Sequence, residues 1–122
     1  MKKFKFSLDT VHKVREIRQE KESITLAELQ MEAEKAAVRV AEIESLRHEA
    51  MENYLRRLTS GDQLSASELE LNSNHFASLD RLQKEAEAEL KVRKQACLQQ
   101  IGLVSEAMRD VKITDKLREA QK

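Results

Sequence analysis

Three histidines, one cysteine and several acidic residues are the side chains of this sequence best suited to catalysis or metal binding. His12, His48 and His75 lie far apart, with no Gly-rich phosphate loop or nucleophile motif beside them. Glu44, His48 and Glu52 share one face of a predicted helix, where they would either coordinate a metal or form exposed salt bridges. Salt bridges are favoured because the set lacks a second histidine or a cysteine. The sequence therefore predicts no enzyme, no cofactor and no metal site.

Cysteine usage and the N-terminal residues indicate a cellular compartment. Cys97 is the only cysteine, so no internal disulfide can form, and its heptad position favours a packing role over a redox role. The N-terminal lysines are followed by polar residues rather than by the apolar run of a signal peptide. No segment reaches the length of a membrane span. These features predict a cytoplasmic protein.

Composition limits the fold to long helices. Of the 122 residues only 3% are aromatic and 36% are charged, which cannot fill a globular core but suits helices that share a narrow apolar seam. Proline is absent, and glycine occurs only at Gly61 and Gly102. Lys plus Arg equals Asp plus Glu, at 22 each, which argues against nucleic acid as a partner. No small-molecule substrate is expected either, because so narrow a core leaves no room for a wide pocket.

Apolar residues repeat with heptad spacing in both halves of the chain. A second stripe in the first half, with one apolar residue in every seven, is expected to widen the same face of the helix. Ile101 and Met108 are expected to widen the face of the second helix in the same way. The first seam comprises Leu26, Leu29, Ala33, Ala36, Val40 and Ile43; the second stripe comprises Ile17, Ile24, Met31 and Val38; the second seam runs from Leu69 through Phe76, Leu90, Cys97 and Val104 to Val111.

A turn signal separates the two halves. Gly61 can end a helix in the left-handed conformation, and Ser65 with Glu68 forms a capping box that begins the next helix. We predict a helix over about 8–58, a turn over 59–65 and a helix over about 66–120. A turn this short makes the helices antiparallel. The predicted fold is thus all-α, a single coiled-coil hairpin domain over 1–122 that is monomeric on its own.

Charge changes sign along the chain. Residues 1–21 and 91–122 each carry a net charge of +4, whereas 22–52 and 62–90 each carry −5. Antiparallel pairing would bring the two basic segments together, at some cost from repulsion. The segregation indicates either a surface shaped for partners or merely solvated helix faces. In the first case the basic end is a docking surface that includes Lys3, Lys5, Lys13 and Arg15.

Two groups of apolar residues are candidate contacts. Phe4 and Phe6 alternate with basic residues, which suits either insertion into a partner's cavity or a disordered terminus. Phe76, Leu79 and Leu82 span two turns of the second helix and form either a recognition patch or, for the first two, part of the seam.

The sequence resembles the FliJ family of flagellar type III export proteins over nearly its whole length. The resemblance lies in the opening FKFSLDTVHKVRE at 4–16, the Glu- and Ala-rich first helix, Gly61 followed by Glu68 and Phe76, and the closing KITDKLRE at 112–119. It implies a coiled-coil stalk, similar to that of the rotary ATP synthase gamma subunit, that inserts into the hexameric export ATPase and promotes its assembly and activity.

The resemblance also implies contacts with the export gate protein at the inner membrane and with export chaperones. Phe76, Leu79 and Leu82 would then face the gate, whereas Lys3, Phe4, Lys5, Phe6, Lys13 and Arg15 would face the ATPase ring. Such a protein would be cytoplasmic and peripherally associated with the inner-membrane apparatus. Two alternatives stay open, namely the equivalent stalk of a virulence type III secretion system and a structural coiled-coil scaffold with no ATPase partner.

Overall fold

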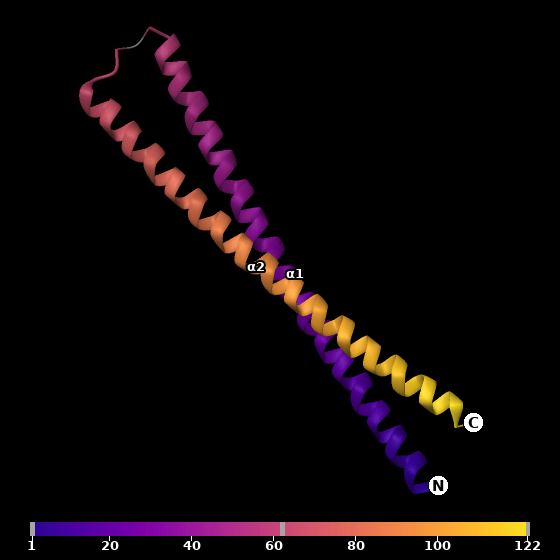
Figure 1. The fold of residues 1–122 in the computed structure, drawn as a ribbon. Helices are drawn as coiled ribbons and strands as arrows, with labels where there is room; N and C mark the ends of the chain where they lie inside the picture. The colour runs from indigo at the N-terminus through magenta and orange to yellow at the C-terminus, as the bar shows by residue number, and fades with distance from the viewer. Residues whose placement is uncertain (1, 62, 122) are drawn as a thin grey trace. The chain divides into compact units, whose positions relative to one another are not determined.

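The computed structural model describes the backbone of residues 2–61 and 63–121 and the side chains of 7–61 and 63–121. Two long helices, α1 (Lys2–Thr59) and α2 (Ala66–Ala120), account for nearly all of the described chain, which contains no strand (Figure 1). The prediction of an all-α antiparallel hairpin is confirmed. The predicted bounds agree with α2 at both ends and with the end of α1 to one residue, while α1 begins six residues earlier than predicted.

The turn between the helices depends on Gly61. Its φ of 83° lies in the left-handed region, where side chains with a Cβ are strained, so the predicted helix stop is confirmed. The backbone N–H of Ser60 donates to the carbonyl oxygen of Arg56 at 2.9 Å, which closes the last turn of α1. The chain then leaves the helical conformation and can reverse direction.

Ser65 caps the N-terminus of α2, although only half of the predicted capping box forms. The Ser65 hydroxyl accepts a hydrogen bond from the backbone N–H of Glu68 at 3.1 Å, and the Ser65 carbonyl accepts from the N–H of Leu69 at 3.0 Å. The Glu68 carboxylate instead accepts from the Arg57 guanidinium, 2.8 Å away on α1. The side chain that would have completed the cap therefore ties the two helix ends together.

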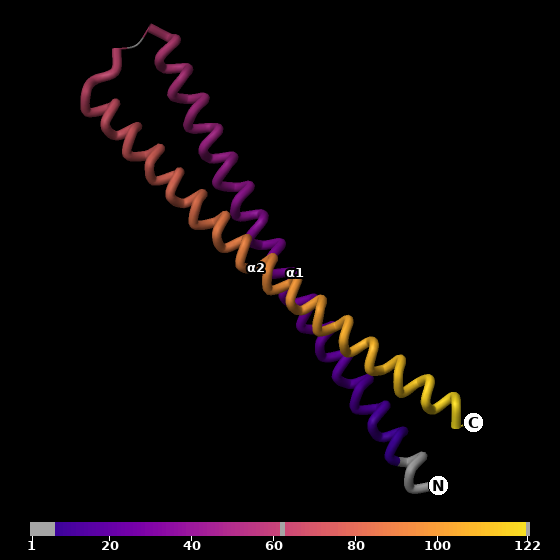
Figure 2. The backbone as a smooth tube through the Cα atoms, viewed as in Figure 1, coloured from indigo at the N-terminus to yellow at the C-terminus, as the bar shows by residue number. Residues whose placement is uncertain are grey.

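The described chain forms two compact units. The terminal unit comprises Met1–Glu32 and Arg93–Lys122, and the turn unit comprises Ala33–Val92. In each unit a segment of α1 runs antiparallel to a segment of α2, as the backbone traces show (Figures 1 and 2). The terminal unit thus joins parts of the chain that are far apart in sequence.

The turn unit has an apolar core of heptad residues. Ala36 and Ile43 of α1 and Leu79 and Ala86 of α2 are buried, and Ile43 is only 2% exposed. Burying a side chain of this size stabilises a fold by about 1.5 to 3 kcal/mol. Toward the turn, Tyr54 and Phe76 meet edge to face with ring centroids 5.7 Å apart. These residues occupy the positions that the heptad spacing predicts.

The seam of the terminal unit mixes polar with apolar residues, unlike the buried core of the turn unit. Ala107 is buried there, but so are His12, Gln100 and Thr114. Toward the N-terminus the three-four spacing continues from Leu26 through polar residues, namely Glu22, Gln19, Arg15 and His12, all of which are buried or half-buried. The heptad period therefore persists in this unit although the residue types change.

The expectation that a second stripe widens the α1 seam is wrong. Ile17, Ile24, Met31 and Val38 are between 45% and 60% exposed. Each lies five residues after a seam position such as His12 or Gln19, a step of about 500° around the helix axis, or about 140° from the seam residue. The stripe consequently covers the outer face of α1, nearly opposite α2.

Candidate functional site

Residues considered for metal binding form exposed ion pairs. Nε2 of His48 lies 3.0 Å from Oε1 of Glu52, and the other Glu52 oxygen lies 3.9 Å from Arg56. Among residues 7–61 and 63–121, no group of three or more His, Cys, Asp or Glu side chains is placed to hold a metal ion. The salt-bridge alternative thus accounts for His48 and Glu52. Cys97 is a half-buried free thiol at its seam position.

The residues predicted to face an ATPase ring differ in their solvent exposure and in their contacts with α2. The side chains of Lys3, Phe4, Lys5 and Phe6 lie outside the described residues. Lys13 is exposed. Arg15 is half-buried and donates from Nη1 to the backbone oxygen of Asp110 on α2 at 3.0 Å. Lys13 is therefore open to a partner, whereas Arg15 also holds the terminal unit together.

The two units carry opposite net charge. The terminal unit has 14 basic and 10 acidic side chains, a net charge of +4; the turn unit has 8 basic and 12 acidic, a net charge of −4. Within the terminal unit, acidic residues are placed opposite basic ones across the helices. Arg118 lies 2.8 Å from Asp9, and Arg18 lies 3.3 Å from Asp110. Such exposed pairs contribute at most about 1 kcal/mol each, but they offset part of the predicted repulsion.

Sequence reasoning missed the polar contacts of the terminal unit. Nδ1 of His12 lies 2.7 Å from Oγ1 of Thr114, and both side chains are buried. The Gln100 amide donates at 2.9 Å to the backbone oxygen and to the carboxylate of Glu22. Extending the three-four spacing upstream of Leu26 would have placed His12 and Glu22 in the seam. The spacing alone does not show that their partners would be Thr114 and Gln100.

The predicted gate patch is divided between core and surface. Leu79 is buried in the turn unit, Phe76 is half-buried against Tyr54, and Leu82 is exposed. The first two fill seam positions and Leu82 lies at the seam's edge, as the heptad spacing indicates. Asp80, next to Leu79, lies 3.6 Å from the Arg47 guanidinium of α1. A partner would consequently meet Leu82 directly and reach Leu79 only from one side.

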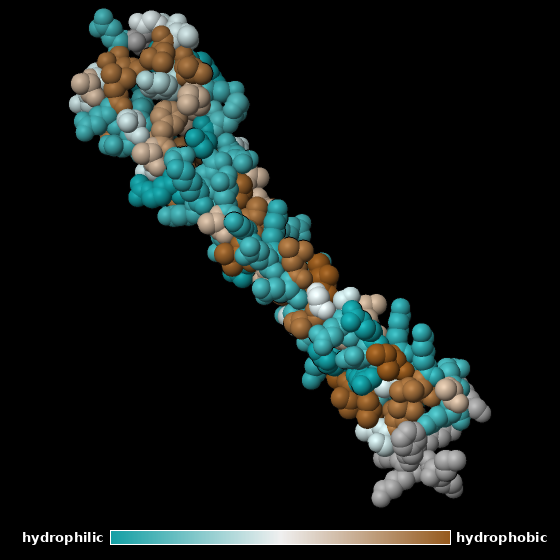
Figure 3. All heavy atoms as spheres, viewed as in Figure 1, coloured by the Kyte–Doolittle hydropathy of each residue, from teal (hydrophilic) through white to brown (hydrophobic). Residues whose placement is uncertain are grey.

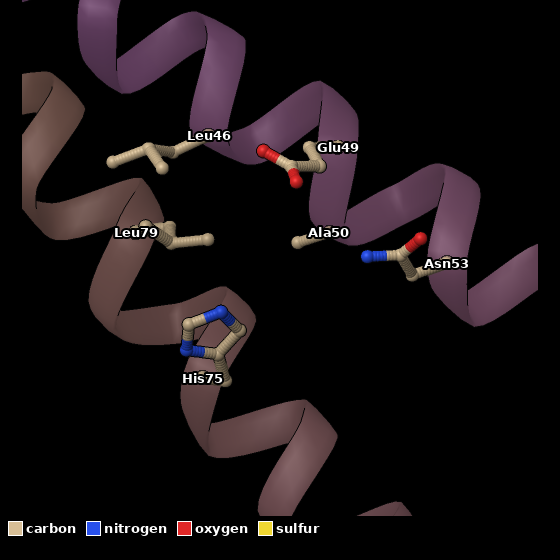
Figure 4. A pocket seen from close by; sticks show the side chains of 6 residues that line it. All are labelled: Leu46, Glu49, Ala50, Asn53, His75 and Leu79. Atoms are coloured by element: carbon tan, nitrogen blue, oxygen red, sulfur yellow. The ribbon is translucent and has the colours of Figure 1, made fainter.

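A pocket of about 280 Å³ provides that side access to Leu79. Leu46 and Ala50 of α1 form an apolar wall opposite Leu79 of α2 (Figure 4). The polar groups of Glu49, Asn53 and His75 complete the lining. A pocket that combines apolar walls with a few polar groups is suited to one apolar side chain of a partner.

A third surface lies on α2 in the terminal unit. Leu98, Ile101 and Met108 are 68%, 46% and 43% exposed, and patches of hydrophobic residues are visible on this unit in the space-filling view (Figure 3). Ile101 and Met108 therefore flank the seam instead of lying within it. This surface was not identified from the sequence as a contact site.

Neither described helix contains a segment long and apolar enough to cross a membrane. No family model, curated protein or solved structure matches the chain.

Proposed function

We propose that the protein is a non-catalytic stalk of the flagellar type III protein export apparatus, which binds the hexameric export ATPase and the export gate. In this role it acts in the cytoplasm, peripherally associated with the inner-membrane apparatus, and also contacts export chaperones. The proposal combines the resemblance of the opening and closing segments to the FliJ family with the antiparallel two-helix fold.

The observation that carries the proposal is the charge and composition of the terminal unit. Segments from both ends of the chain pack together there, and the unit has a net charge of +4 while the turn unit has −4. A two-helix basic element suits a docking surface inside a ring of complementary charge, because long-range attraction speeds association and orients the partners. Lys13 is exposed at this surface.

The gate contact rests on the turn unit. The pocket beside Leu79 has apolar walls open to solvent, and Leu82 is exposed on the same helix. An apolar side chain of the gate would enter the pocket between Leu46 and Leu79, while Phe76 stabilises the site by packing on Tyr54. The binding energy would then come from a small buried contact, as is usual in protein interfaces.

The test is whether the purified protein binds the export ATPase of its own organism and raises its rate of ATP hydrolysis. Binding and stimulation with the flagellar enzyme are expected. Preferential binding to the ATPase of a virulence secretion system would favour that alternative. Failure to bind any hexameric secretion ATPase would contradict the proposal and leave the structural scaffold.

A further inference from the structure

One face of α2 in the terminal unit carries an apolar stripe that nothing in the described chain covers. Leu98, Ile101, Ser105 and Met108 follow one another at spacings of three, four and three residues, so they lie in a line along the helix. We call this line the α2 stripe. Its three apolar members are exposed, and Leu98 is 68% exposed. The line extends for about 15 Å, at a rise of about 1.5 Å per residue.

Basic residues bracket the α2 stripe. Lys94 lies one turn before Leu98, and Lys112 lies one turn after Met108, so both continue the same line. Arg109 and Lys116 lie on the adjacent face. All four cations are exposed, and none forms an ion pair within the described residues. On this face the acidic residues Asp115 and Glu119 are outnumbered two to one.

The exposed stripe of α1 lacks this charge pattern. Ile17, Ile24 and Met31 are comparably exposed, but the residues beside them alternate in sign, with Glu20 next to Lys21. An apolar stripe with mixed charges beside it favours no particular partner charge. The α2 stripe therefore differs from other exposed apolar residues in the sign of the charges around it.

We propose that the α2 stripe is a docking site for an acidic amphipathic helix of a partner protein. Leu98, Ile101 and Met108 would pack against the partner's apolar residues, while Lys94 and Lys112 would pair with carboxylates about one turn beyond each end. Gly102 lies one turn from Leu98, and a Cβ placed on it would meet nothing within 4 Å, so a partner backbone has room to approach closely. The site is separate from residues 3–15 and does not require the ATPase.

The shape of the stripe favours a helix over a lipid surface. Helices that lie on membranes present an apolar face at least about 100° wide with basic residues on the opposite or flanking side. The α2 stripe is a single line of three apolar side chains, bounded at its two ends by Lys94 and Lys112. A helix of three to four turns matches both its width and its length.

The test uses a synthetic acidic helical peptide of about 18 residues, or five turns, with Leu at heptad a and d positions and Glu at e and g. Its binding to the full chain is measured by fluorescence anisotropy.

The expected Kd is tighter than about 1 mM, and the Leu98→Ser, Ile101→Ser variant should weaken binding by about tenfold or more. Raising salt from about 0.1 to 1 M should also weaken it, because the Debye length falls from about 10 to 3 Å. A counterpart peptide with Lys in place of Glu should bind at least about tenfold more weakly.

Matched variants on α1 distinguish a specific site on α2 from nonspecific hydrophobic or electrostatic binding. The control for the apolar residues is the double variant Ile24→Ser, Met31→Ser, which removes two apolar residues of similar exposure from the same unit. The test of the cations is the double variant Lys94→Glu, Lys112→Glu. Its control is the double variant Lys13→Glu, Lys21→Glu, which makes the same change in charge on α1. Only the α2 variants should lose binding. Equal losses in both sets, or no binding of the acidic peptide, would overturn the proposal. The proposal would also be overturned if the protein sedimented with vesicles of phosphatidylcholine and phosphatidylserine but did not bind the peptide.

Discussion

Nδ1 of His12 on α1 lies 2.7 Å from the hydroxyl oxygen of Thr114 on α2, and both side chains are buried in the terminal unit. The same hydroxyl lies 3.2 Å from the backbone oxygen of Asp110 and 3.1 Å from that of Val111. A carbonyl oxygen only accepts, so when the hydroxyl donates its single hydrogen to one of these oxygens, Nδ1–H of His12 donates to Thr114. Nε2 then faces Oε1 of Glu16 at 3.5 Å.

Replacing Thr114 with valine should destabilise the protein by about 1 to 3 kcal/mol, because the buried Nδ1 of His12 loses its hydrogen-bond partner. Adding His12→Leu to Thr114→Val should recover most of that loss, since an apolar pair leaves no buried donor unsatisfied. Urea unfolding followed by circular dichroism measures both effects. Strictly additive free energies of unfolding in this double-mutant cycle would show that His12 and Thr114 are not coupled.

Two isoleucines on α1 test the placement of the seam. Ile43 is 2% exposed whereas Ile24 is 53% exposed. Ile43→Ala should cost about 2 to 5 kcal/mol of unfolding free energy, as core truncations do, and Ile24→Ala should change it by about 0.5 kcal/mol or less. Similar losses of thermal stability in the two variants would mean that the outer stripe is covered by part of the same molecule.

The two glycines should respond to alanine with opposite signs. Gly61→Ala places a Cβ on a residue with φ of 83°, which should cost about 1 to 2 kcal/mol. Gly102→Ala meets no neighbour within 4 Å inside a helix, so it should stabilise the protein by about 0.5 to 1 kcal/mol. Thermal melting of both variants provides the comparison. Stabilisation by Gly61→Ala would contradict the left-handed turn.

The pocket in the turn unit can be tested without disturbing the core. Leu46→Ser alters an exposed lining residue and should weaken binding of the export gate about tenfold, or about 1.4 kcal/mol, while the helical content measured by circular dichroism stays unchanged. Leu71→Ser, at another exposed leucine of the same unit outside the pocket, is the matched control. Calorimetry with the soluble domain of the gate should detect no change for the control. Unchanged affinity for Leu46→Ser would rule out the pocket.

Phe76 and Leu79 require a different comparison, because truncating packed residues commonly costs about 2 to 5 kcal/mol. The Phe76→Ala, Leu79→Ala variant is therefore assayed for gate binding, ATPase stimulation and melting together. A lower melting temperature is expected, but helicity and ATPase stimulation should be kept at the assay temperature while gate binding is lost. If helicity and both partner interactions fall together, these residues act only in the core.

The fold was predictable because a heptad pattern and a turn signal are local. The spacing around Ile43 placed the turn-unit core, and Gly61 with Ser65 placed the turn. The terminal unit was harder, because polar residues share its seam with apolar ones and only the cross-helix pairing shows that His12 meets Thr114. Exposure of Leu98 also depends on which side of α2 faces α1, which composition does not determine.

The affinity of the chain for the purified hexameric export ATPase tests whether the basic terminal unit docks on the ATPase ring. The first variant reverses the charge of three basic residues of the terminal unit, by Lys3→Glu, Lys5→Glu and Lys13→Glu together. It keeps Arg15, which donates to the backbone of Asp110. The matched control makes the same change in net charge within the turn unit, by Arg39→Glu, Arg56→Glu and Arg81→Glu together. Docking through the terminal unit predicts a Kd at least about tenfold weaker for the first variant, a nearly unchanged Kd for the control, and weaker binding of the wild type as salt rises. Equal affinities for the wild type and both variants, independent of salt, would contradict it.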